Sequence, residues 1–158
     1  MVIRSILEDI RTIERAAQLG ANRLAVIGRT MREIEQAGMY AGQPTEQWQD
    51  RNGKGRYLYM LFRTKSYYSR AHGQYEGPDG KRKLYIGNKP EAIAEARRLA
   101  QNRERWNTLD REHGRIKDRL GRVKVTLGIM AIELQSYFGA GDMEVAGESG
   151  PQNQPVVQ

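Results

Sequence analysis

The sequence predicts a mainly helical protein, in which a long antiparallel coiled-coil hairpin carries a small three-stranded antiparallel sheet at its tip. Near both ends of the chain, apolar residues recur with alternating spacings of three and four, which is typical of coiled-coil helices. The segment between them alternates every second residue, as strands do. Of the 158 residues only 39% are hydrophobic and 28% are charged, a composition that suits elongated helices better than a compact globule.

The first helix is expected over residues 3–37. Its small and apolar positions form one unbroken seam: Ile3, Ile6, Ile10, Ile13, Ala17, Gly20, Leu24, Ile27, Met31 and Ile34. Gly38 is placed to cap this helix, and Pro44 prevents its continuation.

The second helix is expected over residues 89–138. Asn88 is a candidate N-cap, Pro90 suits the first turn, and Glu91 has the spacing of a capping box. The seam of this helix follows the same alternation of three and four: Leu99, Asn102, Trp106, Leu109, His113, Ile116, Leu120, Val123, Leu127, Met130, Leu134 and Tyr137. The two polar members, Asn102 and His113, are expected to fix the register of packing.

Two helices separated by an insert predict an antiparallel hairpin. Val125, Ile129 and Ile132 form a second apolar stripe beside the seam, which predicts a homodimer through the bases of the helices. The expected organisation is a first helix over 1–38, a β-sheet insert over 39–88, a second helix over 89–138 and a disordered tail over 139–158.

Within the insert, three strands are expected, at Arg56–Arg63, Ser66–Tyr75 and Lys81–Gly87. In the first, Tyr57, Tyr59 and Leu61 alternate with Leu58, Met60 and Phe62. Pro78, Asp79 and Gly80 indicate a turn before the third strand. Tyr57, Tyr59 and Tyr85 are assigned to packing more readily than to binding.

The positive charge of the protein is concentrated in this insert. Residues 51–89 hold ten Lys and Arg against two acidic residues, a balance of +8, whereas the rest of the chain has a balance of −1. Edge strands carry a few cations to avoid aggregation, but that explains two or three charges and not ten. Basic residues mixed with aromatic ones favour contact with phosphate backbones and groove edges.

The stretch from Gly55 to Gln101, with "GKRKLYIGN" ending the last strand and "PEAIAEARRLAQ" opening the helix, resembles the arm-type DNA-binding domain of tyrosine recombinases and its AP2-like relatives. In that family the three-stranded sheet lies in the major groove. The resemblance implies that DNA is the nucleic acid rather than RNA, and that five residues lie near it: Arg63, Lys65, Arg70, Lys81 and Lys83. The second strand is longer than in the family and contains Gly73, and the residues for recombinase chemistry are absent.

The expected function is therefore non-enzymatic binding of nucleic acid through the basic tip. Phosphate contact is assigned to Arg56, Arg63, Lys65, Arg70, Lys81, Arg82, Lys83 and Lys89, and base or sugar contact to Tyr67, Tyr68 and His72. No catalytic residue, metal site or cofactor is expected, because cysteine is absent and the two histidines lie far apart. The alternative is a structural or adaptor coiled-coil protein that binds a protein partner.

The same features predict a cytoplasmic protein without a membrane span, associated with the nucleoid if DNA is its ligand.

Overall fold

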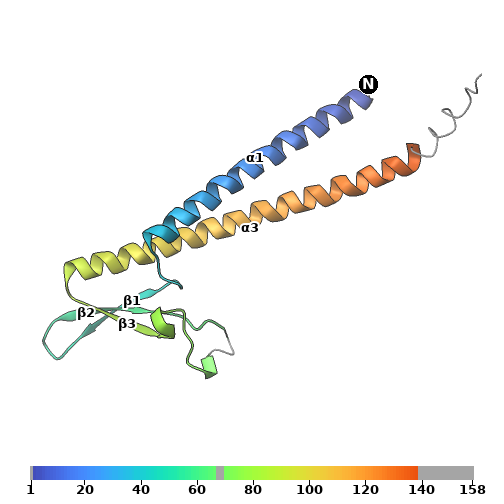
Figure 1. The fold of residues 1–158 in the computed structure, drawn as a ribbon. Coiled ribbons are helices and arrows are strands. Elements are labelled where there is room, and N and C mark those ends of the chain that lie inside the picture. The colour runs from blue at the N-terminus through green and yellow to red at the C-terminus, as the bar shows by residue number, and fades with distance from the viewer. Residues whose placement is uncertain (1, 67–69, 139–158) are drawn as a thin grey trace, which may run out of the picture. The chain divides into compact units, whose positions relative to one another are not determined.

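The two expected helices are present, and the predicted fold class is confirmed (Figure 1). In the computed structural model, which describes residues 2–66 and 70–138, α1 spans Val2–Ala37 and α3 spans Pro90–Phe138. The predicted disordered tail, 139–158, lies outside the described residues.

The helices form a hairpin, because their contacts pair rising residue numbers in α1 with falling ones in α3. Arg23 donates hydrogen bonds from Nε and Nη2 to the two carboxylate oxygens of Glu112, at 2.8 and 3.2 Å. The indole Nε1 of Trp106 donates to Glu35, at 2.9 Å. The hydrogen bond from Arg23 lowers the pKa of the Glu112 carboxyl. Both contacts are exposed ion pairs or hydrogen bonds, so they fix alignment more than they add stability.

The seam of α1 is buried most deeply near its C-terminal end. Ile27 and Ile34 belong to the core, and the neighbouring seam residues Leu24 and Met31 are half-buried. The chain divides into two compact units, residues 1–116 and 117–158, and each is described by itself.

In the second unit, apolar residues of α3 keep their helical spacing, but their side chains are exposed. Val125 is 63% exposed, Ile129 54% and Ile132 67%, as the predicted second stripe requires. The seam positions of this unit are exposed as well: Val123, Leu127, Met130, Leu134 and Tyr137. The helix that the heptad spacing predicts is therefore present here. The expected burial of its seam is not observed.

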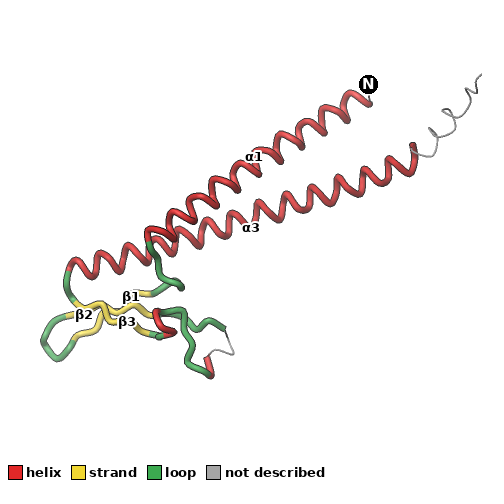
Figure 2. The backbone as a smooth tube through the Cα atoms, in the orientation of Figure 1, coloured by secondary structure: helices red, strands yellow, loops and turns green. Residues whose placement is uncertain are grey.

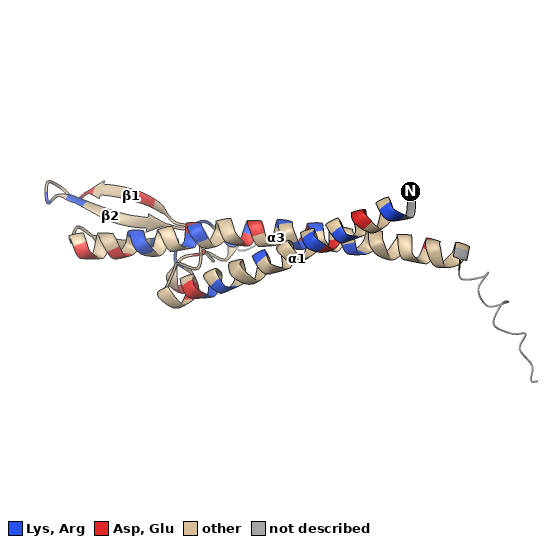
Figure 3. Ribbon diagram, turned by 90° about the horizontal axis from the view of Figure 1, so that it is seen from above, with Lys and Arg blue, Asp and Glu red and all other residues tan. Residues whose placement is uncertain are grey.

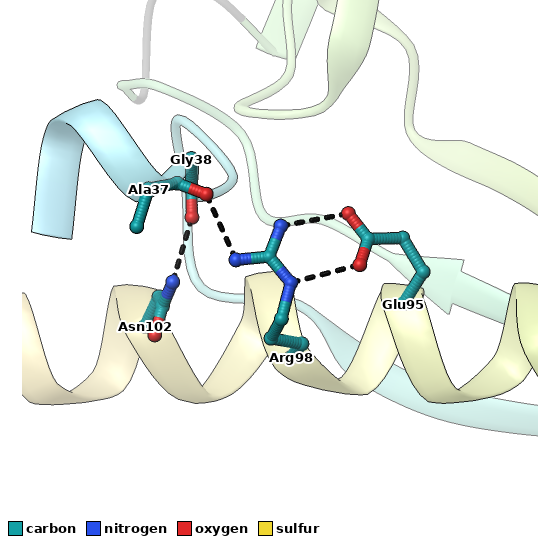
Figure 4. A network of polar contacts seen from close by, with 5 residues as sticks. All are labelled: Ala37, Gly38, Glu95, Arg98 and Asn102. Carbon is teal, nitrogen blue, oxygen red and sulfur yellow. Dashed lines mark hydrogen bonds and ion pairs between the residues drawn. The ribbon is translucent and has the colours of Figure 1, made fainter.

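The end of α1 is fastened to α3 by two side chains (Figure 4). Asn102 donates from Nδ2 to the carbonyl oxygen of Gly38 at 2.8 Å, and Arg98 donates from Nη1 to that of Ala37 at 2.8 Å. Arg98 is itself held by Glu95 through two hydrogen bonds, of 2.8 and 2.7 Å. Gly38 has a φ of +89°, the left-handed conformation that glycine adopts after the last helical residue, so the predicted cap is confirmed. The carbonyls that a helix end leaves unpaired are therefore satisfied by the other helix.

The sheet is three-stranded and antiparallel, but one of its strands differs from the prediction (Figure 2). Its members, in the order β1-β2-β3, are β1 Thr45–Asp50, β2 Arg56–Leu61 and β3 Lys83–Gly87. The prediction of a strand over 66–75 was wrong: among its described residues Arg70 and Ala71 are helical, and only Tyr75 forms a β-bridge, to Thr64. β1 and β3 occupy both edges of β2, which leaves no edge for a further partner, and Gly73 has a φ of +65°.

The missed strand is joined to β2 by a tight turn at Asn52 and Gly53, which have φ values of +45° and +74°. The amide of Lys54 donates to the carbonyl of Arg51 at 2.8 Å, which closes the turn. Asn-Gly is the preferred pair for such turns between antiparallel strands. This dipeptide was the available signal for β1.

The inner face of the sheet packs on the first turns of α3. Leu58, Met60 and Phe62 are buried there, as the alternation in β2 predicted, and contact Tyr40 and Ala96 in one cluster. Tyr40 meets Phe62 edge-on, with ring centroids 5.3 Å apart.

An ion pair joins α3 to β1, the edge strand of the sheet. Arg97 donates from Nε and Nη2 to the two oxygens of Glu46 in β1, at 2.8 and 3.0 Å. These hydrogen bonds lower the pKa of the Glu46 carboxyl. Residues of α3 thus hold both the end of α1 and the sheet.

Removal of the Asn102 side chain tests the fastening of α1. In Asn102→Ala the carbonyl of Gly38 loses its donor, while alanine favours the helix slightly, so we expect a net loss of about 0.5 to 1 kcal/mol. Urea unfolding followed by circular dichroism measures it. Gln101→Ala, one residue away on the exposed side, is the control and should lose nothing; an equal loss in both variants would contradict the assigned role.

Candidate nucleic-acid interface

The outer face of the sheet, turned away from its core, carries a cluster of tyrosines. The ring centroids of Tyr59 and Tyr85 lie 5.2 Å apart, and those of Tyr57 and Tyr85 6.0 Å. The ammonium of Lys83 stands over the ring of Tyr59 at 3.9 Å, and the guanidinium of Arg51 lies 5.6 Å from that of Tyr85. Tyr59 is buried among these neighbours, whereas Tyr85 is 50% exposed. We call this cluster of five residues the tyrosine face.

The strand that sequence reasoning missed adds amides to the same face. In the register of the sheet, Gln47 lies opposite Tyr59 and Gln49 opposite Tyr57. Gln49 donates from Nε2 to Oε1 of Gln47 at 3.3 Å. Side-chain amides can read base edges through paired hydrogen bonds, so this face has the chemistry for direct readout.

A second feature lies beyond the end of β2, where three of the predicted arginines converge. It is a groove of about 420 Å³, which we call the arginine groove, lined by Phe62, Arg63, Thr64, Arg70, Tyr75 and Arg82. Among the described residues, its lining contains three guanidinium groups, two hydroxyls and no carboxylate. Such a donor set favours a phosphate or another oxyanion.

Main-chain contacts bring these distant residues together. The amide of Phe62 donates to the carbonyl of Arg82 at 2.8 Å, and that of Glu76 donates to the carbonyl of Arg63 at 2.9 Å. Gly77 is required by close approach, since a Cβ there would overlap the carbonyl oxygen of Lys81 and reach 2.7 Å from the ring of Phe62. The arginines are therefore positioned by the backbone.

The arginines of the groove differ in their partners from the three arginines that fasten the hairpin and the sheet. Each arginine that fastens the hairpin and the sheet is paired with a carboxylate: Arg23 with Glu112, Arg97 with Glu46 and Arg98 with Glu95. Within the described chain, Arg63, Arg70 and Arg82 form no side-chain hydrogen bond and no ion pair. Their charges repel one another, and an anion between them would relieve that repulsion.

The three consecutive cations of the insert, of which only Lys83 lies in β3, have different surroundings. Lys83 joins the tyrosine face and Arg82 joins the arginine groove. Lys81 makes an ion pair with Asp79 at 4.0 Å. The three side chains therefore do not share one site.

The remaining predicted residues are not gathered at either feature. Arg56 begins β2, Lys65 and His72 lie in the connection from β2 to β3, and Lys89 precedes α3; all four are exposed. Tyr67 and Tyr68 lie outside the described residues. Figure 3 shows that Lys and Arg also recur along α1 and α3, interspersed there with Asp and Glu.

Neither a metal cluster nor a membrane-spanning helix occurs in the described part of the chain. Across 2–66 and 70–138, no group of three or more His, Asp or Glu is placed to hold a metal ion. None of the helices described here is long and apolar enough to cross a membrane.

Comparison of the chain with models of protein families, with curated proteins and with solved structures found no match.

Proposed function

We propose that the protein binds nucleic acid without catalysing a reaction, and that its ligand is duplex DNA. The observation that carries this proposal is the arginine groove, in which Arg63, Arg70 and Arg82 converge without a carboxylate. Three guanidinium groups share this one groove, and such a concentration of positive charge favours the binding of a polyanion there.

The two features of the tip divide the work of recognition. The arginine groove takes backbone phosphates, which hold the protein on the duplex and carry no sequence information. The tyrosine face, with Gln47 and Gln49 beside it, contacts base edges. Among the strands, the resemblance to arm-type DNA-binding domains, in which the sheet enters the major groove, covers only β2 and β3, because β1 lies before Gly55 and the strand expected over 66–75 is not formed.

Binding is tested with Arg63→Ala combined with Arg70→Ala. The control carries two alanines at Arg29 and Arg122, exposed cations of α1 and α3. We expect the tip variant to bind duplex DNA more weakly whatever its sequence, with a salt slope lower by about 1 for each phosphate that the variant no longer neutralises. Fluorescence anisotropy over a salt series measures both quantities.

Equal loss of affinity in the tip variant and the control would exclude the tip as the site. The same titration with duplex RNA separates the two nucleic acids, and tighter binding of RNA would contradict the choice of DNA. If the wild-type protein binds neither at low salt, the adaptor alternative replaces this proposal.

We further propose that the protein forms a homodimer through the C-terminal part of α3. Support comes from Val125, Ile129 and Ile132, which recur at helical spacing and are all more than half exposed. An uncovered apolar stripe of this kind is typical of an interface. A dimer would present two tips to one duplex and so raise the overall affinity.

The dimer is tested by Ile129→Glu, which places a charge in the middle of the stripe. Light scattering at micromolar concentration should give a dimer for the wild type and a monomer for the variant. Glu133→Gln, a change outside the stripe, is the control and should remain dimeric. A monomeric wild type would contradict the proposal.

A further inference from the structure

We infer that the phosphate-binding surface continues from the arginine groove onto α3, where Arg103 and Arg111 form a second seat for a single phosphodiester group. The inference rests on the proposed function and deepens it, since neither residue lies in the basic insert that the sequence singles out. It adds a helix of the hairpin to the nucleic-acid interface.

The second seat is a polar groove of about 510 Å³, which we call the helix groove. Its lining comes from the segment between α1 and β1, from β1, from the connection between β2 and β3, and from α3. The residues are Gln43, Thr45, Arg63, Glu76, Arg103, Asn107, Asp110 and Arg111. Arg63 lines the arginine groove as well. The two grooves therefore adjoin at one guanidinium, and an extended anion such as a nucleic-acid strand can occupy both.

Arg103 is held in place without an acceptor for its charge. Its Nε is buried and, within the described chain, has no hydrogen-bond partner. Its guanidinium lies 4.9 Å from the centre of the Trp106 ring, and that ring is fixed in turn by the hydrogen bond from Nε1 to Glu35. Because Arg103 lines the helix groove, a phosphate oxygen bound there can accept from the other nitrogens of its guanidinium group.

Two arginines nearer the N-terminus of α3 have the carboxylate partner that Arg103 lacks. Arg97 and Arg98 each make a two-point pair with a glutamate. Arg111 donates only to the carbonyl of Asn107, at 3.2 Å, and to the hydroxyl of Thr108, at 3.3 Å. α3 contributes two arginines to the helix groove, Arg103 and Arg111. Neither forms an ion pair with a carboxylate of the described residues.

The charge of the helix groove selects the kind of phosphate. Glu76 and Asp110 line it together with the three arginines, and no ion pair joins these groups among the described residues. The net charge of the lining is therefore +1. A phosphodiester carries one negative charge, which balances the net charge of +1 in the lining. A phosphate dianion carries two negative charges, so one of them would remain uncompensated beside the two carboxylates.

The test is the salt dependence of binding to duplex DNA by full-length Arg103→Gln, which keeps a long polar side chain. We expect a slope lower by about 1 than that of the wild type, with the loss independent of sequence. Arg105→Gln is the matched control, because Arg105 is an exposed arginine two residues away on α3. Its slope should equal that of the wild type or fall by less.

A second measurement separates the sources of phosphate and does not depend on the variant folding well. The Nε–Hε resonance of Arg103 is followed by NMR during titration of the wild type with duplex DNA and, separately, with inorganic phosphate. A shift with duplex DNA alone supports the seat. A shift with inorganic phosphate alone would assign the groove to a free anion and overturn the inference.

The failures of the two proposals are distinguishable. If wild-type protein binds DNA, the Arg63 and Arg70 variant binds it less, and Arg103→Gln matches the wild type in slope and resonance, then the second seat is wrong and the proposed function stands. If the wild type binds no nucleic acid, both are wrong.

Discussion

The capping of α1 by side chains of α3 is the constraint on which the rest of the first unit depends. Arg98 donates to the carbonyl of Ala37, the last residue of α1, and Asn102 donates to that of the following Gly38. These two hydrogen bonds fix the position of the end of α1 along α3. The chain then leaves α1 through Gly38 and Tyr40, and Tyr40 enters the core beneath the sheet. The same turns of α3 that cap α1 also pack against β2 and pair with β1. The sheet and the hairpin therefore depend on the same stretch of α3.

Arginine serves two purposes in this molecule, and the difference lies in its partners. Paired with glutamate, it aligns helices and fastens the sheet, and the hydrogen bonds it donates lower the pKa of Glu46, Glu95 and Glu112. In the arginine groove the arginines have no carboxylate partner among the described residues, so they remain available to bind an external anion. The net charge alone does not distinguish the two uses. The distribution of carboxylates around each guanidinium does.

The helices, β2 and β3 could be predicted because their signals are local: heptad spacing, Gly38 at the end of α1, alternation in β2 and the turn residues Pro78, Asp79 and Gly80 before β3. β1 was missed because Thr45–Asp50 contains a single large apolar residue, Trp48, and its pairing with β2 depends on the turn at Asn52 and Gly53. Arg63, Arg70 and Arg82 were expected to bind, but their convergence follows from main-chain contacts between segments far apart in sequence. Arg103 could not be singled out, since in sequence an arginine facing a groove looks the same as one facing solvent.

Hydrogen–deuterium exchange with and without a short DNA duplex tests most directly whether the tip of the molecule is the nucleic-acid interface. Backbone amides around Arg63, Arg82 and Lys83 should exchange more slowly in the complex, because the ligand would cover the arginine groove and the tyrosine face. Amides of α1 from residues 4 to 20, remote in sequence from the insert, should be unaffected. Protection confined to α1, or no protection around the arginines in a sample that binds DNA, would contradict the account.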